Sequence, residues 1–300
     1  MEYIKVSAAA EKWGISARRV RILCAEDKIP GVIKKGKLYM IPENAEKPID
    51  GRIARAGLLA IIEEKKKKLQ SLRPLTPGEV ARLREEFMVD FTYNSNAIEG
   101  NTLTLKETAM VLEGMTIDQK PLKDHLEAVG HKDAFLYVED IAGRNTALTD
   151  SVIKNIHSLV LMNQPEDKGV FRRIPVKIMG AYTAPVQPYL IEPKITELLL
   201  VNEECKTTMN QLERIARFHL EFEGIHPFID GNGRTGRLLM NLDVIQNGYP
   251  PVNVKFTDRK RYYDAFDAFY RDGNPDKMTE LISEYVDKRL DEYLKVLADK

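Results

Sequence analysis

The sequence lacks the features that mark several common classes of protein. Its 300 residues include only two cysteines, Cys24 and Cys205, which are far apart and form no spaced pattern. We therefore expect no disulfide framework and a reducing compartment. No apolar run is long enough to span a bilayer. The first residues, MEYIKVSAAAEKWG, lack a basic region followed by an apolar stretch, so we expect no signal peptide. These absences predict a cytoplasmic protein without a membrane partner.

An excess of charge of one sign is also missing. The chain has 45 lysines and arginines against 45 aspartates and glutamates. Residues 1–50 alone have ten basic and seven acidic side chains, a small positive bias that only hints at a polyanionic partner. A hydrophobic content of 43% and a charged content of 30% are ordinary for a soluble chain with a sizeable core.

Residues 1–48 are predicted to form a small separate domain. Ser7 precedes a short helix that Gly14 can end, and Ser16 can cap a second helix. The stretch GVIKKGKLYMIP has apolar residues on both sides of Lys35-Gly36, which predicts a hairpin or wing. This pattern resembles the winged helix-turn-helix domains of the MerR and excisionase type. The resemblance implies a DNA partner for residues 1–48, and a docked protein is the alternative. The basic side chains that would contact DNA are Arg18, Arg19, Arg21, Lys34, Lys35 and Lys37.

The rest of the chain is predicted to be mainly α-helical. Residues 49–75 should form a linker and a connecting helix, and residues 76–300 a second domain. Thr76 is placed to cap a helix that has Pro77 at its first position. Apolar residues recur at helical spacing in LTDSVIKNIHSLVL and NQLERIARFHLEFEGI. Residues 169–180 alternate instead, which predicts a β-hairpin flap. The predicted fold is thus a helical bundle with one flap.

The segment HPFIDGNGRTGR, residues 226–237, is rich in glycine and in side chains that can do chemistry. Its glycines match G-x-G-x-x-G, but a dinucleotide-binding loop needs a strand before it and an acidic residue about twenty positions later. Helical patterns flank the segment, and no Lys-Ser/Thr pair follows the glycines, so neither a Rossmann loop nor a Walker loop is expected. Glycines between two helices leave backbone N–H groups free at a helix N-terminus, which predicts an anion site.

Four side chains of this segment suit phosphate chemistry. Arg234 and Arg237 can neutralise phosphate oxygens with bidentate geometry. Asp230 offers a hard oxygen ligand for Mg²⁺, and His226 has a near-neutral ordinary pKa that suits a general base. The segment therefore predicts transfer of a group from a nucleotide to a hydroxyl. A buried helix–loop–helix junction, in which these side chains only satisfy local carbonyls, is the alternative.

The segment resembles the Fic family signature, H-P-F-x-D/E-G-N-G-R-x-x-R, at all nine specified positions, and the similarity extends from about Glu79 to Asp287. Fic enzymes are helical proteins, most of which transfer AMP from ATP to a protein hydroxyl. The resemblance implies that His226 deprotonates the target Ser, Thr or Tyr, that Asp230 holds Mg²⁺ against the phosphates, and that Arg237 binds the γ-phosphate. It also implies that Phe228 anchors the loop in the core. The implied phosphate cradle consists of Gly231, Asn232, Gly233 and Arg234, and the implied adenine pocket includes Tyr262 and Tyr263.

A second polar segment, TYNSNAIEGNTLT, spans residues 92–104. Ser95, Glu99 and Gly100 resemble the inhibitory motif S/T-x-x-x-E-G/N of Fic proteins, which places an inhibitory helix at about residues 92–100. A Glu99 carboxylate paired with Arg237 would occupy the group meant for the γ-phosphate and leave the α-phosphate misaligned. The motif precedes the catalytic segment on the same chain, so the resemblance is to class II Fic proteins, which are inhibited intramolecularly. Spacing alone also allows a serine cap and an exposed glutamate at a helix end.

The sequence thus predicts a protein adenylyltransferase that uses ATP and Mg²⁺, releases pyrophosphate and is autoinhibited through Glu99. Its target is a protein hydroxyl, its own included. Two alternatives remain open. The same site can remove AMP or move another nucleotide-derived group, or the Fic-like domain can serve as the nucleotide sensor of a transcription regulator. The resemblance to the Fic family also implies a homodimer.

Overall fold

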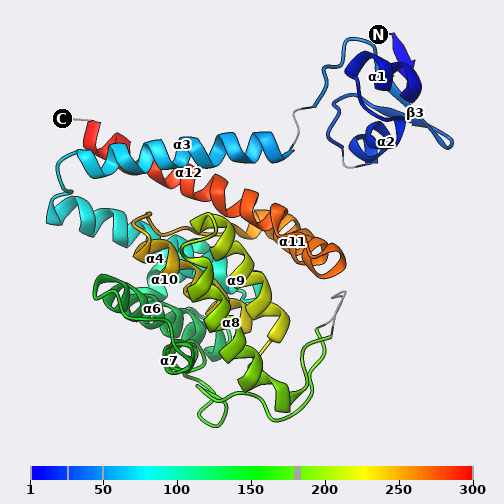
Figure 1. The fold of residues 1–300 in the computed structure, drawn as a ribbon. Coiled ribbons are helices and arrows are strands. Elements are labelled where there is room, and N and C mark those ends of the chain that lie inside the picture. Colours follow the sequence, from blue (N-terminus) through cyan, green and yellow to red (C-terminus); the bar gives the residue numbers. More distant parts are fainter. Residues whose placement is uncertain (1, 26, 49–50, 179–183, 299–300) are drawn as a thin grey trace. The chain divides into compact units, whose positions relative to one another are not determined.

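The computed structural model describes residues 2–25, 27–48, 51–178 and 184–298. These residues are mainly helical, with one small β-sheet near the N-terminus (Figure 1). They divide into two compact units, Met1–Gly57 and Leu58–Lys300. The division falls within helix α3 (Gly51–Ser71), inside the stretch where the sequence predicts a connecting helix. No helix in the described part of the chain is both long and apolar enough to cross a bilayer.

The N-terminal unit begins with a strand and two short helices. They are β1 (Tyr3–Lys5), α1 (Val6–Trp13) and α2 (Ala17–Ala25). Gly14 ends α1 in the left-handed conformation, with φ 64°, as predicted. Ser16 caps α2, since its Oγ accepts a hydrogen bond from the backbone N–H of Arg19 at 3.2 Å. Helix α1 already begins at Val6, so Ser7 lies inside it rather than before it, and that part of the prediction was wrong.

The predicted hairpin of this unit is present. Strands β2 (Ile33–Lys35) and β3 (Leu38–Pro42) pair antiparallel, and β1 pairs with the other edge of β3. Because Lys35 lies opposite Leu38, the connection is a two-residue turn, and Gly36 takes the positive φ of 61° that such a turn requires. A small core joins the sheet to both helices, and it includes Ala9, Trp13, Val20, Leu23 and Ile41.

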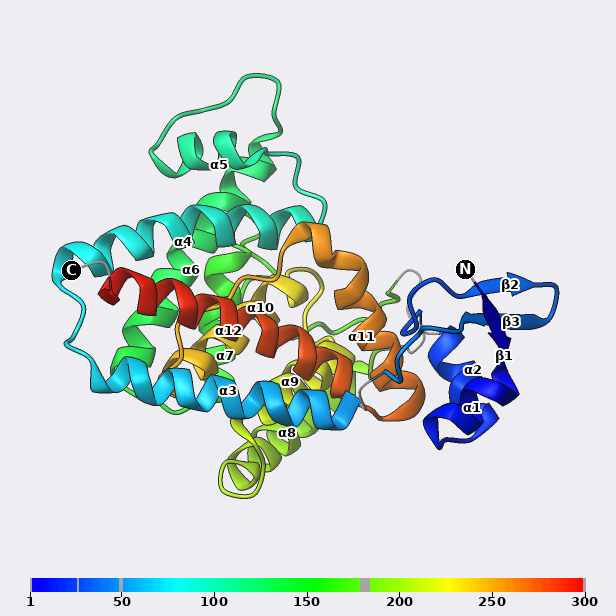
Figure 2. The ribbon, with the colours of Figure 1, turned by 90° about the horizontal axis from the view of Figure 1, so that it is seen from above.

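The C-terminal unit is a helical bundle around α10 (Asn232–Gln246). The helices that contact α10 are α4 (Pro77–Ile98), α6 (Leu122–Gly143), α7 (Asp150–Val160) and α9 (Gln211–Ile225) (Figures 1 and 2). The remaining helices are α5 (Leu105–Leu112), α8 (Ile191–Cys205), α11 (Arg259–Asp272) and α12 (Asp276–Ala298), with short 3₁₀ turns at Pro188–Leu190 and Phe256–Asp258. The later part of α3 lies beside α12 (Figure 2), where Lys65 pairs with Asp287 at 2.7 Å.

Helix α4 begins where the sequence predicted. The Oγ1 of Thr76 accepts a hydrogen bond from the N–H of Glu79 at 3.3 Å, and the Glu79 carboxylate accepts one from the N–H of Thr76 at 2.8 Å. This reciprocal capping box, with Pro77 at the first position, fixes the start of the helix. The helix then runs without a break to Ile98, so residues 92–98 form its last two turns and Glu99 follows directly as its C-cap.

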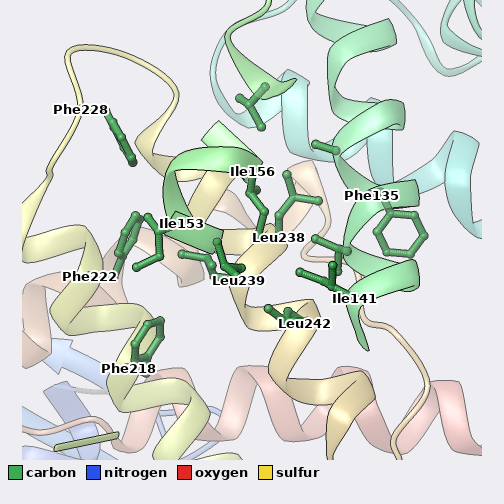
Figure 3. Packing of buried hydrophobic residues seen from close by; sticks show 14 of the residues in the cluster. Phe135, Ile141, Ile153, Ile156, Phe218, Phe222, Phe228, Leu238, Leu239 and Leu242 are labelled. Carbon is green, nitrogen blue, oxygen red and sulfur yellow. The ribbon is translucent and has the colours of Figure 1, made fainter. Parts of the chain in front are cut away.

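A large apolar core holds α10 against α6, α7 and α9. Figure 3 shows its centre, where side chains from all four helices meet. Each fully buried side chain of this kind contributes about 1.5–3 kcal/mol relative to an exposed one. The members labelled there include Phe135, Ile153, Ile156, Phe222, Phe228, Leu238 and Leu239. The core therefore fixes the positions of the two helix ends that flank residues 226–231.

The predicted flap is not a β-hairpin in the described residues. Residues 169–178 form no strand, and the end of the predicted hairpin lies outside the described ranges. The backbone there bonds to the neighbouring loop instead of to a second strand. The N–H of Arg172 donates to the carbonyl of Pro227 at 2.9 Å, and its guanidinium donates to the carbonyls of Ile174 and Val186. These bonds take the carbonyls and N–H groups that a ladder would use, and Pro175 offers no N–H.

Candidate active site

The loop between α9 and α10 is closed by its own side chains. Helix α9 ends at Ile225 and is capped by His226, which has a left-handed backbone with φ 52°. Gly231, with φ 76°, precedes the first residue of α10. The side chain of Asn232 accepts a hydrogen bond from the N–H of Phe228 and donates one to its carbonyl, both at 2.9 Å. This amide clamp turns the chain back on itself and holds Phe228 fully buried in the core.

His157 of α7 packs against the loop between α9 and α10. Its ring stacks on Phe228 with centroids 3.6 Å apart and planes within 5°. Its Nδ1 accepts a hydrogen bond from the N–H of Gly169 at 2.8 Å, and its Nε2 lies 3.0 Å from the carbonyl oxygen of Asp230. Burial lowers the pKa of His157 to about 4, so the ring is neutral and Nε2 carries the donated proton. His157 therefore holds the backbone carbonyl of Asp230 and joins this loop to Gly169.

The start of α10 forms an anion site. Its first intrahelical bond runs from the N–H of Thr235 to the carbonyl of Gly231, so the N–H groups of residues 232–234 have no acceptor within the helix. The positive end of the helix dipole adds to their pull on an anion. A Cβ at Gly233 would lie 2.2 Å from Oε1 of Glu99, so only glycine allows this carboxylate to come so close. An anion, the Glu99 carboxylate, thus lies against the helix N-terminus.

Arg237 of α10 binds this carboxylate and the last turn of α4. Its Nη2 donates to Oε1 of Glu99 and to the carbonyl of Ser95, both at 2.8 Å, and its Nε donates to Oγ of Ser95 at 3.0 Å. Burial disfavours the charge, but the Glu99 carboxylate more than offsets this and raises the pKa of Arg237 above its ordinary value. The Nη1 atom is buried and has no hydrogen-bond acceptor among the described residues. The guanidinium therefore keeps donor capacity for a further anion.

His226 is held by its backbone and keeps a neutral ring. Its carbonyl accepts a hydrogen bond from Nε of Arg172 at 2.8 Å, which supports the uncommon left-handed backbone. Burial, with the nearby Arg172 charge, lowers the pKa of His226 to about 4. Its Nδ1 lies 4.0 Å from a carboxyl oxygen of Glu223. At neutral pH the imidazole is thus unprotonated, which is the state that a general base requires.

Asp230 offers a carboxylate that suits a magnesium ion. Its Oδ1 accepts a hydrogen bond from the N–H of Gly231 at 2.6 Å and lies 3.3 Å from Nη2 of Arg234. Burial alone would raise the pKa of Asp230, but Arg234 and this N–H more than offset it, and the pKa lies below the ordinary value. Within the described ranges no three acidic, histidine or cysteine side chains gather to hold a metal alone. A single ionised carboxylate completed by substrate phosphates and water is a common way to bind Mg²⁺.

A cavity of about 390 Å³ opens beside these groups. Its polar wall has Glu99, Glu223, His226 and Arg237, and its aromatic wall has Tyr262, Tyr263, Phe266 and Tyr270. The hydroxyl of Tyr262 lies 2.7 Å from Nε2 of His219, and the hydroxyl of Tyr263 lies 3.4 Å from the carbonyl of Ile98. A mostly apolar hollow of this size with a few convergent polar groups is typical of a small-molecule site.

The family comparison agrees with this geometry. Residues 147–242 match the Fic/DOC family. Residues 147–242 therefore form a Fic domain.

Curated proteins are similar in sequence to this chain over most of its length. "Protein adenylyltransferase Fic" of Drosophila melanogaster is 32% identical over 272 residues, 87% of this chain and 54% of that protein. The protein of the same name from Culex quinquefasciatus is 32% identical over 237 residues, 78% of this chain and 47% of that protein. The chain therefore spans about half the length of the curated relatives it matches.

Solved structures are similar over four fifths of the chain. A Fic domain containing signaling protein from Bacteroides thetaiotaomicron has a TM-score of 0.72 at 25% identity and covers 81% of this chain and 97% of its own. Fic-1 from C. elegans has a TM-score of 0.73 at 26% identity and covers 82% of this chain and 74% of its own. Both similarities extend well beyond residues 147–242.

The structure brings six of the twelve predicted site residues to one cavity. His226, Gly233, Arg237, Glu99 and the two tyrosines line it. Ser95 does not line the cavity but accepts a hydrogen bond from Arg237. Gly100, the last residue of the predicted inhibitory motif, has a positive φ of 93°.

Two side chains predicted for the phosphate cradle lie elsewhere. The amide of Asn232 clamps Phe228, and the guanidinium of Arg234, which is 2% exposed, pairs with Glu127 and Asp230. Neither is among the residues that line the cavity. At the N-terminus of α10 these two residues present only their backbone N–H groups.

Three residues of the Fic domain site were missed by the sequence analysis. His157 and Arg172 hold the loop backbone, and Glu223 lies on the cavity wall, where burial and the Glu99 charge raise its pKa to about 8. Each occupies a position on an apolar helix face or in an extended stretch, which gives no signal by itself. The partners of His157 and Arg172 are distant in sequence, so only the fold reveals these two residues. Glu223 lies three residues before His226, but the sequence does not show that it is buried beside Glu99.

Proposed function

We propose that this chain is a protein adenylyltransferase that uses ATP and Mg²⁺ and is restrained by Glu99. The observation that carries the proposal is the Glu99 carboxylate, which lies against the N-terminus of α10 and pairs with the buried Arg237 at 2.8 Å. An anion site with free donors and a neutral histidine beside one cavity, with an ionised aspartate on the same loop, suits a nucleoside triphosphate. The names of the curated relatives support the same activity.

The proposed reaction needs few protein groups. The hydroxyl oxygen of a target Ser, Thr or Tyr bonds to the α-phosphorus of ATP, and the bond from this phosphorus to the bridging oxygen breaks, so pyrophosphate leaves. His226 takes the proton of the hydroxyl as general base. The N–H groups of residues 232–234 and Arg237 bind phosphate oxygens, and Asp230 would hold Mg²⁺, which neutralises phosphate charge when bound. The aromatic wall of the cavity would receive the adenine.

Glu99 would act as a brake at this site. Its carboxylate occupies a donor of Arg237 and the space above Gly233, where the γ-phosphate would lie. ATP can then bind only with its γ-phosphate displaced from this position, and its α-phosphate is not aligned for in-line attack by the hydroxyl. The Glu99 side chain is 34% exposed and Arg237 is 1% exposed, so the pair opens by movement of the glutamate rather than of the arginine. Removal of AMP, with Glu99 orienting water, is the alternative use of the same site.

The Mg²⁺ assignment is tested by replacing Asp230. Asp230→Ala should abolish Mg²⁺-dependent AMP transfer. It removes a hydrogen bond to Gly231, which contributes about 0.5–1.5 kcal/mol to the free energy of unfolding, and a partly exposed pair with Arg234, so the fold should survive. The matched control is Asp140→Ala, which removes a surface carboxylate paired with Arg144. Transfer measured with added chelator would contradict the assignment if it equalled transfer with Mg²⁺.

We also infer that residues 1–48 form a winged helix-turn-helix domain that binds DNA. Arg18 and Arg21 are exposed on α2, and the wing lysines Lys34 and Lys35 are exposed on β2. Duplex DNA should bind with an affinity that falls as salt rises, and Arg18→Ala with Arg21→Ala should weaken it. Fluorescence anisotropy with labelled duplexes measures this. Equal binding by both proteins would favour a protein partner for the domain instead.

A further inference from the structure

A chain of polar contacts joins the end of α4 to the proposed metal ligand. Asn101, two residues after Glu99, donates from Nδ2 to Oε2 of Glu127 at 2.9 Å. The other carboxyl oxygen of Glu127 lies 3.0 Å from Nη1 of Arg234. Nη2 of the same guanidinium lies 3.3 Å from Oδ1 of Asp230. Helices α4, α6 and α10 thus meet through Asn101, Glu127 and Arg234 at the Asp230 carboxylate.

Arg234 lies between two carboxylates of different character. Its side chain and that of Glu127 are 2% and 8% exposed, whereas that of Asp230 is 41% exposed. Charges this deeply buried interact strongly because little water screens them. Glu127 is the closer and more buried of the two partners, and Asn101 fixes its orientation with a second bond to the carbonyl of Asp124 at 3.1 Å. Glu127 also pairs with the exposed Lys123, at the longer distance of 3.6 Å. The buried Arg234 charge is therefore compensated from the side of α6 as well as by Asp230.

We infer that Glu127 is a positioning residue for Mg²⁺: by pairing with Arg234 it leaves the Asp230 carboxylate free to bind the ion. This inference rests on the proposed function. Asp230 Oδ2 has only a long contact with Nε2 of Gln164, at 3.4 Å, so this oxygen faces no strong donor in the described part of the chain. The segment that contains Glu99 thus also orients the metal-binding carboxylate, through the bond of Asn101 to Glu127.

The consequence of losing the Glu127 charge follows from the geometry. A neutral side chain at position 127 leaves Asp230 as the carboxylate that compensates the buried Arg234. The guanidinium then forms a closer, two-pronged pair with Asp230, because a planar fork matches both carboxylate oxygens. Mg²⁺ must compete with this pair for the same oxygens. ATP that binds without the ion does not meet this competition.

The test compares nucleotide binding with and without the ion. In the Glu99→Gly protein, Glu127→Gln should raise the Mg²⁺ concentration for half-maximal ATP binding at least tenfold, measured by isothermal titration calorimetry. ATP affinity in excess chelator should stay unchanged. Glu127→Asp should restore part of the Mg²⁺ affinity because it restores the charge. The matched control is Glu139→Gln, which removes a carboxylate of α6 that pairs with Arg84 at the surface.

The outcomes separate this inference from the proposed function. Equal Mg²⁺ requirements in the Glu127→Gln and Glu139→Gln proteins, or equal losses with and without the ion, would overturn the positioning role alone. A parent protein whose ATP binding ignores Mg²⁺ would overturn the proposed function and this inference with it. If Glu127→Gln does not fold, Asn101→Ala carries the test. It should shift the Mg²⁺ requirement in the same direction by about threefold, and an unchanged requirement would contradict the inference.

Discussion

Replacing Glu99 with glycine should raise AMP self-labelling at least tenfold above that of the unchanged protein. The change removes the carboxylate that lies over Gly233 and releases the donor of Arg237 that it occupies. The γ-phosphate can then take the place of the carboxylate, and the α-phosphate aligns with His226. A tenfold gain corresponds to about 1.4 kcal/mol in the activation free energy. Transfer of label from ATP that carries ³²P at the α-phosphate measures it.

Two further variants decide whether Glu99 acts through Arg237. Glu99→Gly combined with Arg237→Ala should lose the gain, because the released arginine is absent. Glu113→Gly is the matched control, since Glu113 ends α5 with nearly the same backbone angles and is also followed by glycine. If Glu99 only ended a helix, both glycine variants would lose a little thermal stability and leave labelling flat. That result with an intact fold would contradict the inhibitory role of Glu99, and the roles proposed for residues 226–237 would still stand.

Replacing His226 with alanine in the Glu99→Gly protein should abolish transfer and leave ATP binding intact. The groups that hold phosphate are the backbone N–H groups of α10 and Arg237, and neither depends on the imidazole. Loss of a general base lowers the rate by a factor on the order of 10²–10⁴. Transfer is measured by labelling and ATP binding by calorimetry. Near-normal labelling would remove His226 from its role, and loss of ATP binding would show a structural role instead.

The pH dependence of transfer tests the same residue independently. Burial and the Arg172 charge lower the pKa of His226 to about 4, so the neutral base persists until the pH falls through that value. The Glu99 charge is among the groups that raise this pKa, so Glu99→Gly shifts it no higher. The acid limb of kcat/KM should therefore lie near pH 4 to 5. An acid limb near 6.5, the ordinary value for histidine, would contradict the assigned environment.

Features that depend on neighbouring residues were predictable from the sequence. The capping box at Thr76 and Glu79, the left-handed end of α1 at Gly14 and the turn at Gly36 all follow from local backbone chemistry. Residues 226–237 place a base, an acid, an anion site and a guanidinium on two adjoining helix ends. The relative positions of these groups depend on residues close together in the chain, so they could be predicted from the sequence.

Features that depend on distant partners were not predictable. The alternating pattern of residues 169–178 favoured strands, but Arg172 draws this segment to carbonyls around residues 186 and 226. The role of Arg234 depends on Glu127, more than one hundred positions earlier in the chain. A buried histidine such as His157 has the same sequence pattern as any core residue of an amphipathic helix. Tertiary contacts decide these cases.

The most direct test of the central claim compares two labels on one protein. The Glu99→Gly chain is incubated with Mg²⁺ and ATP that carries ³²P at either the α- or the γ-phosphate, and the protein is separated under denaturing conditions. The proposed adenylyl transfer predicts stable label from the α-position alone, because pyrophosphate leaves with the γ-phosphate. Label from the γ-position would show phosphoryl transfer, and label from neither position would show a site that only senses nucleotide. Either result would contradict the assignment of this Fic domain as an adenylyltransferase.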